Sequence, residues 1–203
     1  MKKIGIIILA AGESKRMGQP KQLLDIDGES LLRRTAKVAL ATGLEPVVMV
    51  VGANKPQIIP EIADLPLTII DNSMWRTGMA SSVKMGMAAL WMNNKNIDAV
   101  LMLVCDQPFL TVGILNKIIA QYQAQSPKIV ACQYAGQVGV PALFDRTMFD
   151  TLLSLTGDKG AKPVLMSHLE DTHLVDFENG IVDLDTIEDY EKSKKRGNTS
   201  AFG

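Results

Sequence analysis

Three cations stand close together just after the first apolar run of the chain. The segment 9–21, LAAGESKRMGQPK, follows IGIII and contains Lys15, Arg16 and Lys21. A guanidinium offers a planar fork to phosphate oxygens, and an ammonium offers a point charge. The small residues 10–12 would let backbone N–H groups approach a flat base or a phosphate closely. The segment therefore indicates an anion-binding loop, and the alternative is a solvated turn with ordinary surface cations.

Neither common phosphate-binding pattern fits this segment. Five residues separate Gly12 from Gly18, and Gln19-Pro20 follows, whereas a P-loop has four residues between its glycines and then Lys-Ser/Thr. A dinucleotide fingerprint needs three glycines, and only two are present. Pro20 stiffens the backbone directly before Lys21. The sequence thus favours a longer loop that presents Lys21 in a fixed position.

Two carboxylates are candidate metal ligands. Asp106 follows the apolar run AVLMLVC, and Mg²⁺ is commonly held by one or two carboxylates together with substrate phosphates. A helix N-cap is the alternative for Asp106, but Thr111 is the better cap for the helix that begins there. For Asp185, two interpretations stay open: a metal ligand, or the N-cap of the last helix with Glu188 completing a capping box.

The pattern of apolar runs predicts the elements that position these residues. Short, nearly continuous runs rich in β-branched residues recur at 3–9, 46–51, 67–70, 99–104 and 128–134, as in strands covered on both faces. Segments with helical spacing lie between the runs. We therefore expect a three-layer α/β fold with a mostly parallel, open sheet, Rossmann-like in kind. Ligands bind at the carboxyl ends of such strands, where the loop and Asp106 would meet.

The regular alternation of apolar runs and helical segments ends after about residue 136, which predicts a small β extension in the C-terminal third. Here GQVGVPALF reads as a loop feeding a short strand, and DRTMFDTLLSLTG as a helix ending at Gly157. The dipeptide Asn179-Gly180 predicts a hairpin. We expect one domain over residues 1–195 and a polar tail over 196–203.

Composition excludes several classes of function. The formal net charge is −1 and aromatic residues make up 5% of the chain, so there is no general attraction to nucleic acid or to a membrane surface. Cys105 and Cys132 lie in apolar runs and are expected to be free thiols. The N-terminal apolar run is short, and charged residues follow it, which argues against a signal peptide. These features predict a cytoplasmic protein.

The segment LAAGESKRMGQPKQLL closely resembles the signature L-A-A-G-x-S-x-R-M-G-x-P-K-x-L-L of the molybdenum cofactor nucleotidyltransferases, particularly the cytidylyltransferase branch. Further matches follow in order at 72–82 (NSMWRTGMASS), 105–108 (CDQP), 157–162 (GDKGAK) and 183–190 (DLDTIEDY). The resemblance covers nearly the whole chain. It implies transfer of CMP from CTP to the terminal phosphate of molybdopterin, with pyrophosphate released, Mg²⁺ as cofactor, and docking to a molybdoenzyme.

The resemblance also implies roles for individual residues. Lys21 would contact the α-phosphate and Arg16 the outer phosphates. Asp106 would bind the metal ion. Asp185 is the candidate for the second metal ligand, and Asp183 is the alternative candidate. The implied nucleotide-binding residues are Leu9, Ala10, Ala11, Gly12, Arg16, Met17, Gly18, Lys21, Asn72 and Ser82. The implied acceptor-binding residues are Gln107, Pro108, Gly139, Gly157, Asp158 and Gly160. A phosphate nucleophile needs no strong base, which agrees with only two histidines, His168 and His173.

Two departures from the family pattern fall in the acceptor half. Val140 stands where the cytidylyltransferases usually have His, and Lys162 where they usually have Arg. Ala11 stands where the guanylyl branch tends to have Gly, which favours CTP over GTP. The alternatives are guanylyl transfer to the same cofactor, nucleotidyl transfer to a sugar or polyol phosphate, and a non-catalytic protein that carries the cofactor to a molybdoenzyme.

Overall fold

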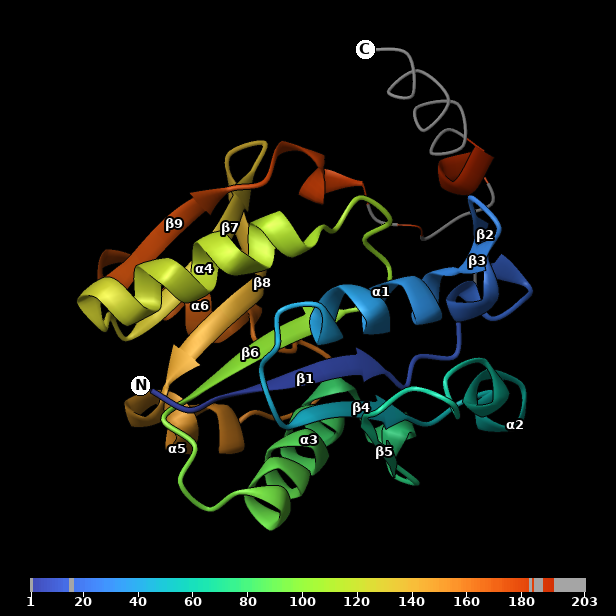
Figure 1. Cartoon of the computed structure of the whole chain (residues 1–203), viewed down its shortest axis with the longest axis horizontal. Helices are drawn as coiled ribbons and strands as arrows, with labels where there is room; N and C mark the ends of the chain where they lie inside the picture. The colour runs from blue at the N-terminus through green and yellow to red at the C-terminus, as the bar shows by residue number, and fades with distance from the viewer. Residues whose placement is uncertain (1, 15–16, 183, 185–187, 192–203) are drawn as a thin grey trace.

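A computed structural model of the chain describes residues 2–14, 17–182, 184 and 188–191. The predicted residues Arg16, Asp183 and Asp185 lie outside this part of the chain. One sheet runs through the molecule in the order β5-β4-β1-β6-β8-β7-β9 (Figure 1). Its strands are β1 Ile4–Ala10, β4 Val47–Val51, β5 Thr68–Asp71, β6 Ala99–Val104, β7 Ile129–Tyr134, β8 Gln137–Asp145 and β9 Thr172–Asp176.

The sheet is mostly parallel, as the apolar runs predict. Only β8 runs antiparallel to its neighbours, β6 and β7, among the strands of this sheet. The interior strand β1, between β4 and β6, is buried at every residue, because helices cover both faces of the sheet. A separate two-stranded sheet pairs β2 Asp25–Ile26 with β3 Glu29–Ser30. The α/β fold class expected from the sequence is confirmed.

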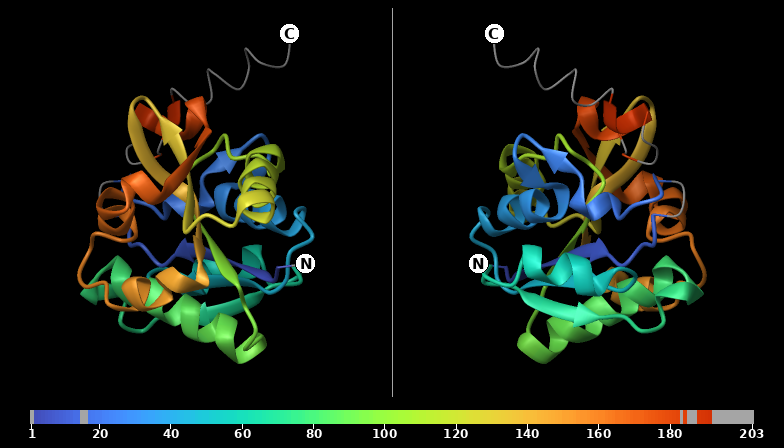
Figure 2. Two further views of the ribbon diagram at one scale, coloured as in Figure 1. Left: turned by 90° about the vertical axis from the view of Figure 1, so that its left-hand side faces the viewer. Right: turned by 90° about the vertical axis from the view of Figure 1, so that its right-hand side faces the viewer.

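Helices pack on both faces of the sheet (Figure 2). The helices are α1 Leu31–Leu40, α2 Lys55–Ile58, α3 Met79–Asn93, α4 Val112–Gln125, α5 Phe149–Leu153 and α6 Lys162–Ser167. α1 and α4 pack with Ile6 and Ile8 of β1 in one core cluster. α3, α5 and α6 pack with Ile7 in the other. The alternation along β1 thus divides the core into two layers. None of the helices in the described part of the chain is long and apolar enough to span a membrane.

Short 3-10 helices connect the main elements. They are η2 Lys21–Leu23, η3 Ile59–Glu61, η4 Trp75–Thr77, η5 Arg146–Met148, η6 Leu169–Asp171 and η7 Glu178–Ile181. The predicted cap of α4 is present, since the Thr111 hydroxyl accepts a hydrogen bond from the Ile114 backbone N–H. The helix predicted to follow β8 is also present, as η5 and α5, but it ends at Leu153 rather than at Gly157.

Two expectations for the C-terminal third are wrong. All of the segment GQVGVPALF after Gly136 belongs to a single strand, β8, because both β6 and β7 offer it hydrogen-bonding partners. The hairpin expected at Asn179-Gly180 is the 3-10 helix η7. A Cβ at Gly180 would lie 2.6 Å from both the Phe177 and the Tyr134 side chains. The tight contact with these two rings, which lie edge to face, favours the compact turn over a hairpin.

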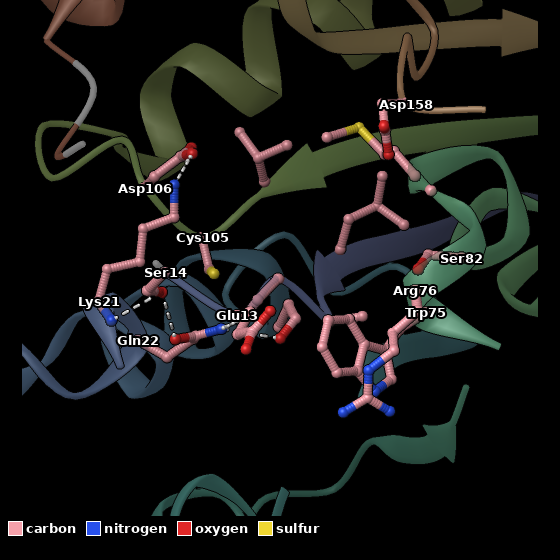
Figure 3. A pocket seen from close by; sticks show the side chains of 17 residues that line it. Glu13, Ser14, Lys21, Gln22, Trp75, Arg76, Ser82, Cys105, Asp106 and Asp158 are labelled. Atoms are coloured by element: carbon pink, nitrogen blue, oxygen red, sulfur yellow. Dashed lines mark hydrogen bonds and ion pairs between the residues drawn. The ribbon is translucent and has the colours of Figure 1, made fainter. Parts of the chain in front are cut away.

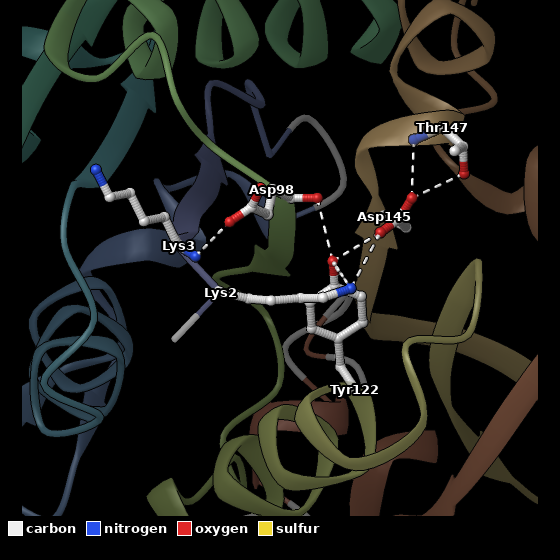
Figure 4. A network of polar contacts seen from close by, with 6 residues as sticks. All are labelled: Lys2, Lys3, Asp98, Tyr122, Asp145 and Thr147. Carbon is white, nitrogen blue, oxygen red and sulfur yellow. Dashed lines mark hydrogen bonds and ion pairs between the residues drawn. The ribbon is translucent and has the colours of Figure 1, made fainter.

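A network of polar contacts lies at the amino end of β1 (Figure 4). The Tyr122 hydroxyl donates to Asp145 Oδ2 over 2.7 Å, and Lys2 Nζ lies 4.6 Å from the centre of the Tyr122 ring. Partial burial by itself raises the pKa of Asp145. Hydrogen bonds from Thr147 and Tyr122 and the charge of Lys2 outweigh it and hold the pKa below its usual range.

Candidate active site

A cavity of about 620 Å³ opens at the carboxyl ends of β1 and β6 (Figure 3). The strand order reverses here, with β4 and β5 on one side of β1 and β6 on the other, which is where open α/β sheets bind ligands. The lining residues are Leu9, Ala10, Ala11, Gly12, Glu13, Ser14, Lys21, Gln22, Trp75, Arg76, Gly78, Met79, Ser82, Val104, Cys105, Asp106 and Asp158. The loop after β1 and Asp106 therefore meet at one edge, as expected.

Gln22 holds the loop after β1 in place. Its amide Nε2 donates to the carbonyl oxygens of Ala10 at 3.1 Å and Gly12 at 2.8 Å. Its Oε1 accepts from the Ser14 hydroxyl, and the Ser14 hydroxyl accepts from the Lys21 backbone N–H at 3.0 Å. Gln22 is 1% exposed. Gln22 is not among the site residues predicted from the sequence, where its only sign is a polar side chain between Lys21 and two leucines.

Lys21 and Asp106 form an ion pair at one end of the cavity. Lys21 Nζ lies 2.6 Å from Asp106 Oδ2, and the two side chains are 17% and 21% exposed. Lys21 begins η2, directly after Pro20, and Asp106 lies two residues beyond the end of β6. Partial burial strengthens such a pair relative to one at the surface. The pair places an ammonium and a carboxylate where a charged ligand could exchange with either.

Asp106 also offers an unused acceptor. Its Oδ1 is buried and has no hydrogen-bond partner among the described residues. A hard cation is a suitable partner for such an oxygen, so the donor chemistry fits one carboxylate ligand of a divalent metal ion. The described residues contain no cluster of three or more Asp, Glu, His or Cys side chains. A metal ion here would thus depend on further ligands such as phosphate oxygens and water.

The far wall of the cavity comes from the segment after β5. Trp75 and Arg76 of η4 line it, and the Arg76 guanidinium lies 4.4 Å from the centre of the Trp75 ring. Ser82, on the first turn of α3, also lines it. Neither Trp75 nor Arg76 is among the site residues predicted from the sequence, although both lie in the segment 72–82 that carries part of the family resemblance. An aromatic residue beside a cation, just before a glycine that opens a helix, was the available signal.

Asn72 supports this wall from behind. It is 1% exposed, and its side-chain amide donates to the hydroxyls of Ser81 at 2.8 Å and Ser82 at 3.0 Å. It lines a neighbouring cavity of about 320 Å³ rather than the main one. Asn72 therefore positions Ser82, while the N-cap of α3 is Gly78.

The residues expected to bind the acceptor are divided. Asp158 lines the main cavity, and Gly157 lines the smaller one and accepts a hydrogen bond from Ala80 N–H at 3.0 Å. Gln107 is 2% exposed, and its amide donates to the carbonyl oxygens of Val140 and Gly180. The predicted residues that do not line the main cavity are Met17, Gly18, Asn72, Gln107, Pro108, Gly139, Gly157 and Gly160.

Neither the thiols nor the imidazoles supply a reactive group to this cavity. Burial, followed by the charge of Asp106, raises the pKa of the Cys105 thiol to about 12, so this thiol stays protonated near neutral pH. His168 contacts Ser167 and the Val164 carbonyl oxygen, and His173 contacts Gln121. Both histidines lie outside the lining of the cavity.

The sequence from residue 6 to residue 172 matches the model of the MobA-like NTP transferase domain. This range includes the loop after β1, Lys21, the segment after β5, and Asp106. The chain belongs to the MobA-like NTP transferase family. The protein is thus a nucleotidyltransferase of this family.

Three relatives are informative. The chain is 30% identical to nicotine blue oxidoreductase of Paenarthrobacter nicotinovorans over 90% of this chain and 92% of that one. It is 27% identical to molybdenum cofactor cytidylyltransferase of Escherichia coli over 97% and 98% of the two chains. Rv0371c of Mycobacterium tuberculosis superposes with a TM-score of 0.81 at 26% identity, over 96% of this chain and 98% of that one. A second structure of Rv0371c is a complex with manganese, with a TM-score of 0.76 at 25% identity over 96% and 99% of the two chains.

Proposed function

We propose that the protein transfers CMP from CTP to the terminal phosphate of molybdopterin and releases pyrophosphate. The observation that carries this proposal is the 2.6 Å pair of Lys21 and Asp106, in a cavity that the small residues 10–12 also line. An ammonium at the start of η2 and a carboxylate just after β6 suit a triphosphate and its metal ion. Similarity to the E. coli molybdenum cofactor cytidylyltransferase over almost the full length of both chains supports the choice of acceptor.

The proposed reaction needs positioned charge more than a base. An oxygen of the acceptor phosphate attacks the α-phosphorus of CTP, and the bond from that phosphorus to the bridging oxygen of the β-phosphate breaks. The attacking oxygen is already anionic, so no residue must remove a proton from it. Lys21 leaves Asp106 and neutralises negative charge on the α-phosphate as it builds up. The role of Arg16 at the outer phosphates stays a prediction.

Mg²⁺ is the proposed cofactor, held by Asp106 through its unpaired Oδ1 and by Asp185. When bound, the ion neutralises charge on the phosphates and lowers the barrier to attack at phosphorus. The proposal includes CTP rather than GTP. Ala11 lies in the wall of the cavity, and its methyl group leaves less room for a purine than the glycine that the guanylyl branch tends to have there. Docking to a molybdoenzyme and a cytoplasmic location stay predictions from the sequence, as do the domain boundary at 195 and the acceptor-binding roles.

The test is pyrophosphate release from CTP, GTP, ATP and UTP with Mg²⁺ and molybdopterin, with and without molybdenum. Lys21→Ala and Asp106→Ala are the test variants, and the exposed Lys95→Ala is the matched control. We expect turnover with CTP that falls at least about 100-fold in both test variants and stays unchanged in the control. Mn²⁺ replaces Mg²⁺ in a parallel series.

Other outcomes assign the protein differently. Turnover with GTP alone would make it a guanylyltransferase. Turnover only with sugar or polyol phosphates would keep the reaction and change the acceptor. Binding of molybdopterin without pyrophosphate release from any nucleotide would favour a cofactor carrier. The pyrophosphate readout also separates nucleotidyl transfer from an oxidation, the reaction class in the name of the P. nicotinovorans relative.

A further inference from the structure

We infer that Trp75 and Arg76 form the base-binding end of the cavity, with the base of the nucleotide stacked on the Trp75 ring and one base carbonyl oxygen bound by the Arg76 guanidinium. This inference rests on the proposed nucleotidyl transfer, because that reaction fixes where the triphosphate lies. Neither residue belongs to the set predicted from the sequence.

The position of the reacting end determines where the base must lie. Lys21 and Asp106 lie on the β6 side of β1, whereas Trp75 and Arg76 follow β5 on its other side. Figure 3 shows the two pairs at opposite ends of the cavity. In a nucleotide the ribose separates the α-phosphate from the base. With the α-phosphate at Lys21, the base therefore reaches toward the Trp75 end.

The chemistry of that end suits a flat heterocycle. Trp75 is the only aromatic residue among those that line the cavity in the described part of the chain. Stacking on an aromatic side chain holds a base whichever polar groups that base carries, and an arginine guanidinium can also stack on bases. The cation–π contact at 4.4 Å keeps the exposed Arg76 guanidinium beside the Trp75 ring at the cavity wall.

Arg76 is available for a polar contact with the base. No ion pair of Arg76 occurs among the described residues, whereas Lys21 is already paired with Asp106. A guanidinium donates hydrogen bonds and accepts none, so its partner on the base must be an acceptor. Cytosine, uracil and guanine each carry a carbonyl oxygen, and adenine carries none. Adenine offers only ring nitrogens as acceptors, so we expect Arg76 to favour CTP over ATP through the carbonyl oxygen of cytosine.

Gly52, at the end of β4, is the positioning residue for this wall. A Cβ at Gly52 would lie 2.8 Å from Trp75 Cβ and 2.9 Å from Ala11 Cβ. Both atoms are attached directly to the backbone, so neither can swing aside. Gly52 therefore lets the Trp75 wall and the loop after β1 approach closely, and an added methyl group would push them apart.

The experiment uses Trp91→Phe, which leaves Trp75 as the single tryptophan. Trp91 packs against Phe149 away from the cavity. CTP and inorganic tripolyphosphate, which has no base, are titrated with calorimetry and tryptophan fluorescence. We expect both to bind but only CTP to quench Trp75. We expect Trp75→Ala to weaken CTP binding about 10- to 100-fold, and Trp75→Phe to weaken it less.

Arg76→Gln separates base reading from phosphate binding. We expect it to weaken CTP binding while leaving the affinities for ATP and tripolyphosphate within about twofold of wild type, so that CTP loses its advantage over ATP. An equal loss for tripolyphosphate would place Arg76 on the phosphates and overturn its role. Thermal unfolding of each variant verifies that it folds.

The remaining outcomes separate this inference from the proposed function. Calorimetric CTP binding that depends on Lys21, without quenching of Trp75 and with unchanged affinity in Trp75→Ala, would overturn the base site and leave the transferase intact. If neither CTP nor tripolyphosphate binds, the proposed function fails and the base site fails with it. Gly52→Ala is expected to weaken CTP binding as Trp75→Ala does and to weaken tripolyphosphate binding as well, because the added methyl group meets both Trp75 and Ala11; unchanged CTP affinity in the folded variant would overturn the positioning role of Gly52.

Discussion

Replacement of Gln22 by Met is expected to loosen the backbone of residues 10–12, which begin the loop after β1, while leaving the sequence of those residues unchanged. Met is close to Gln in length and shape and lacks the amide that donates to Ala10 and Gly12 at 3.1 and 2.8 Å. Each lost hydrogen bond weakens the folded state by about 0.5–1.5 kcal/mol net, and the sum is about 2 kcal/mol. Ala10 is 2% exposed, so water cannot readily replace the lost donor at its carbonyl oxygen.

The loss of about 2 kcal/mol can be measured in two ways, as a change in CTP affinity and as a change in melting temperature. If the full 2 kcal/mol is felt in nucleotide binding, the affinity for CTP falls about 30-fold. If it is felt in global stability, the melting temperature falls by about 4–8 °C for a domain of this size. We expect a 10- to 30-fold loss of CTP affinity by calorimetry and a drop in melting temperature smaller than that range, because the loop borders the cavity and only part of it is packed in the core.

Gln123→Met on the exposed side of α4 is the matched control, and it should change neither readout. Gln22→Glu gives a second test, since its carboxylate would face the same two carbonyl oxygens with no proton to donate near neutral pH. The reasoning is refuted if folded Gln22→Met binds CTP within twofold of the wild type, because the hydrogen bonds would then not hold the loop in its binding form.

Three further outcomes can be measured. Gly78→Ala should lower both the melting temperature and turnover, because Gly78 has a φ of 109° and a Cβ there would lie 2.4 Å from the Gly157 carbonyl group; Gly113→Ala, which meets only an ordinary contact on α4, is the control. The pKa of Asp145 is held low in the folded protein, so the ionised carboxylate stabilises the fold above about pH 4, and this stabilisation is lost as the pH falls through the folded-state pKa. Urea midpoints measured between pH 6 and pH 3 should therefore decline more for the wild type than for Asp145→Asn. Parallel declines in the two proteins would contradict this. The Cys105 thiol, with its pKa near 12, should react with a thiol reagent at pH 8 at least about 1,000-fold more slowly in native than in unfolded protein, and comparable rates would show that the strand end opens.

The C-terminal third shows where sequence patterns gave the wrong answer and why. Asn-Gly is the strongest short-range signal for a hairpin, but hairpin formation depends on a second strand that can pair beyond the turn. Here β9 is already paired with β7, and Gly180 lies against the rings of Phe177 and Tyr134. Contacts with residues distant in sequence outweighed the local turn preference. The same holds for β8, whose polar start pairs with β7.

The candidate site was predictable where chemistry follows directly from the end of a strand. Asp106 comes just after an apolar strand, and Lys21 comes after a small-residue loop, so both were found by type and position. Gln22 and Asn72 were not assigned their supporting contacts, because a buried amide reveals its partners only when distant backbone groups surround it. Trp75 could be read from sequence as a core residue as easily as a cavity wall.

The sequence by itself determined the α/β class, because strands buried on both faces must be apolar without alternation, and it determined which charged groups follow the strand ends. Tertiary structure alone decided which of those groups meet. Lys21 and Asp106 are 85 residues apart in the chain and 2.6 Å apart in space. Trp75 lies close to the end of β4 at the same cavity, where a side chain on Gly52 would come within 2.8 Å of its Cβ. Composition and spacing constrain each element separately, whereas the register and order of the strands determine which side chains share a cavity.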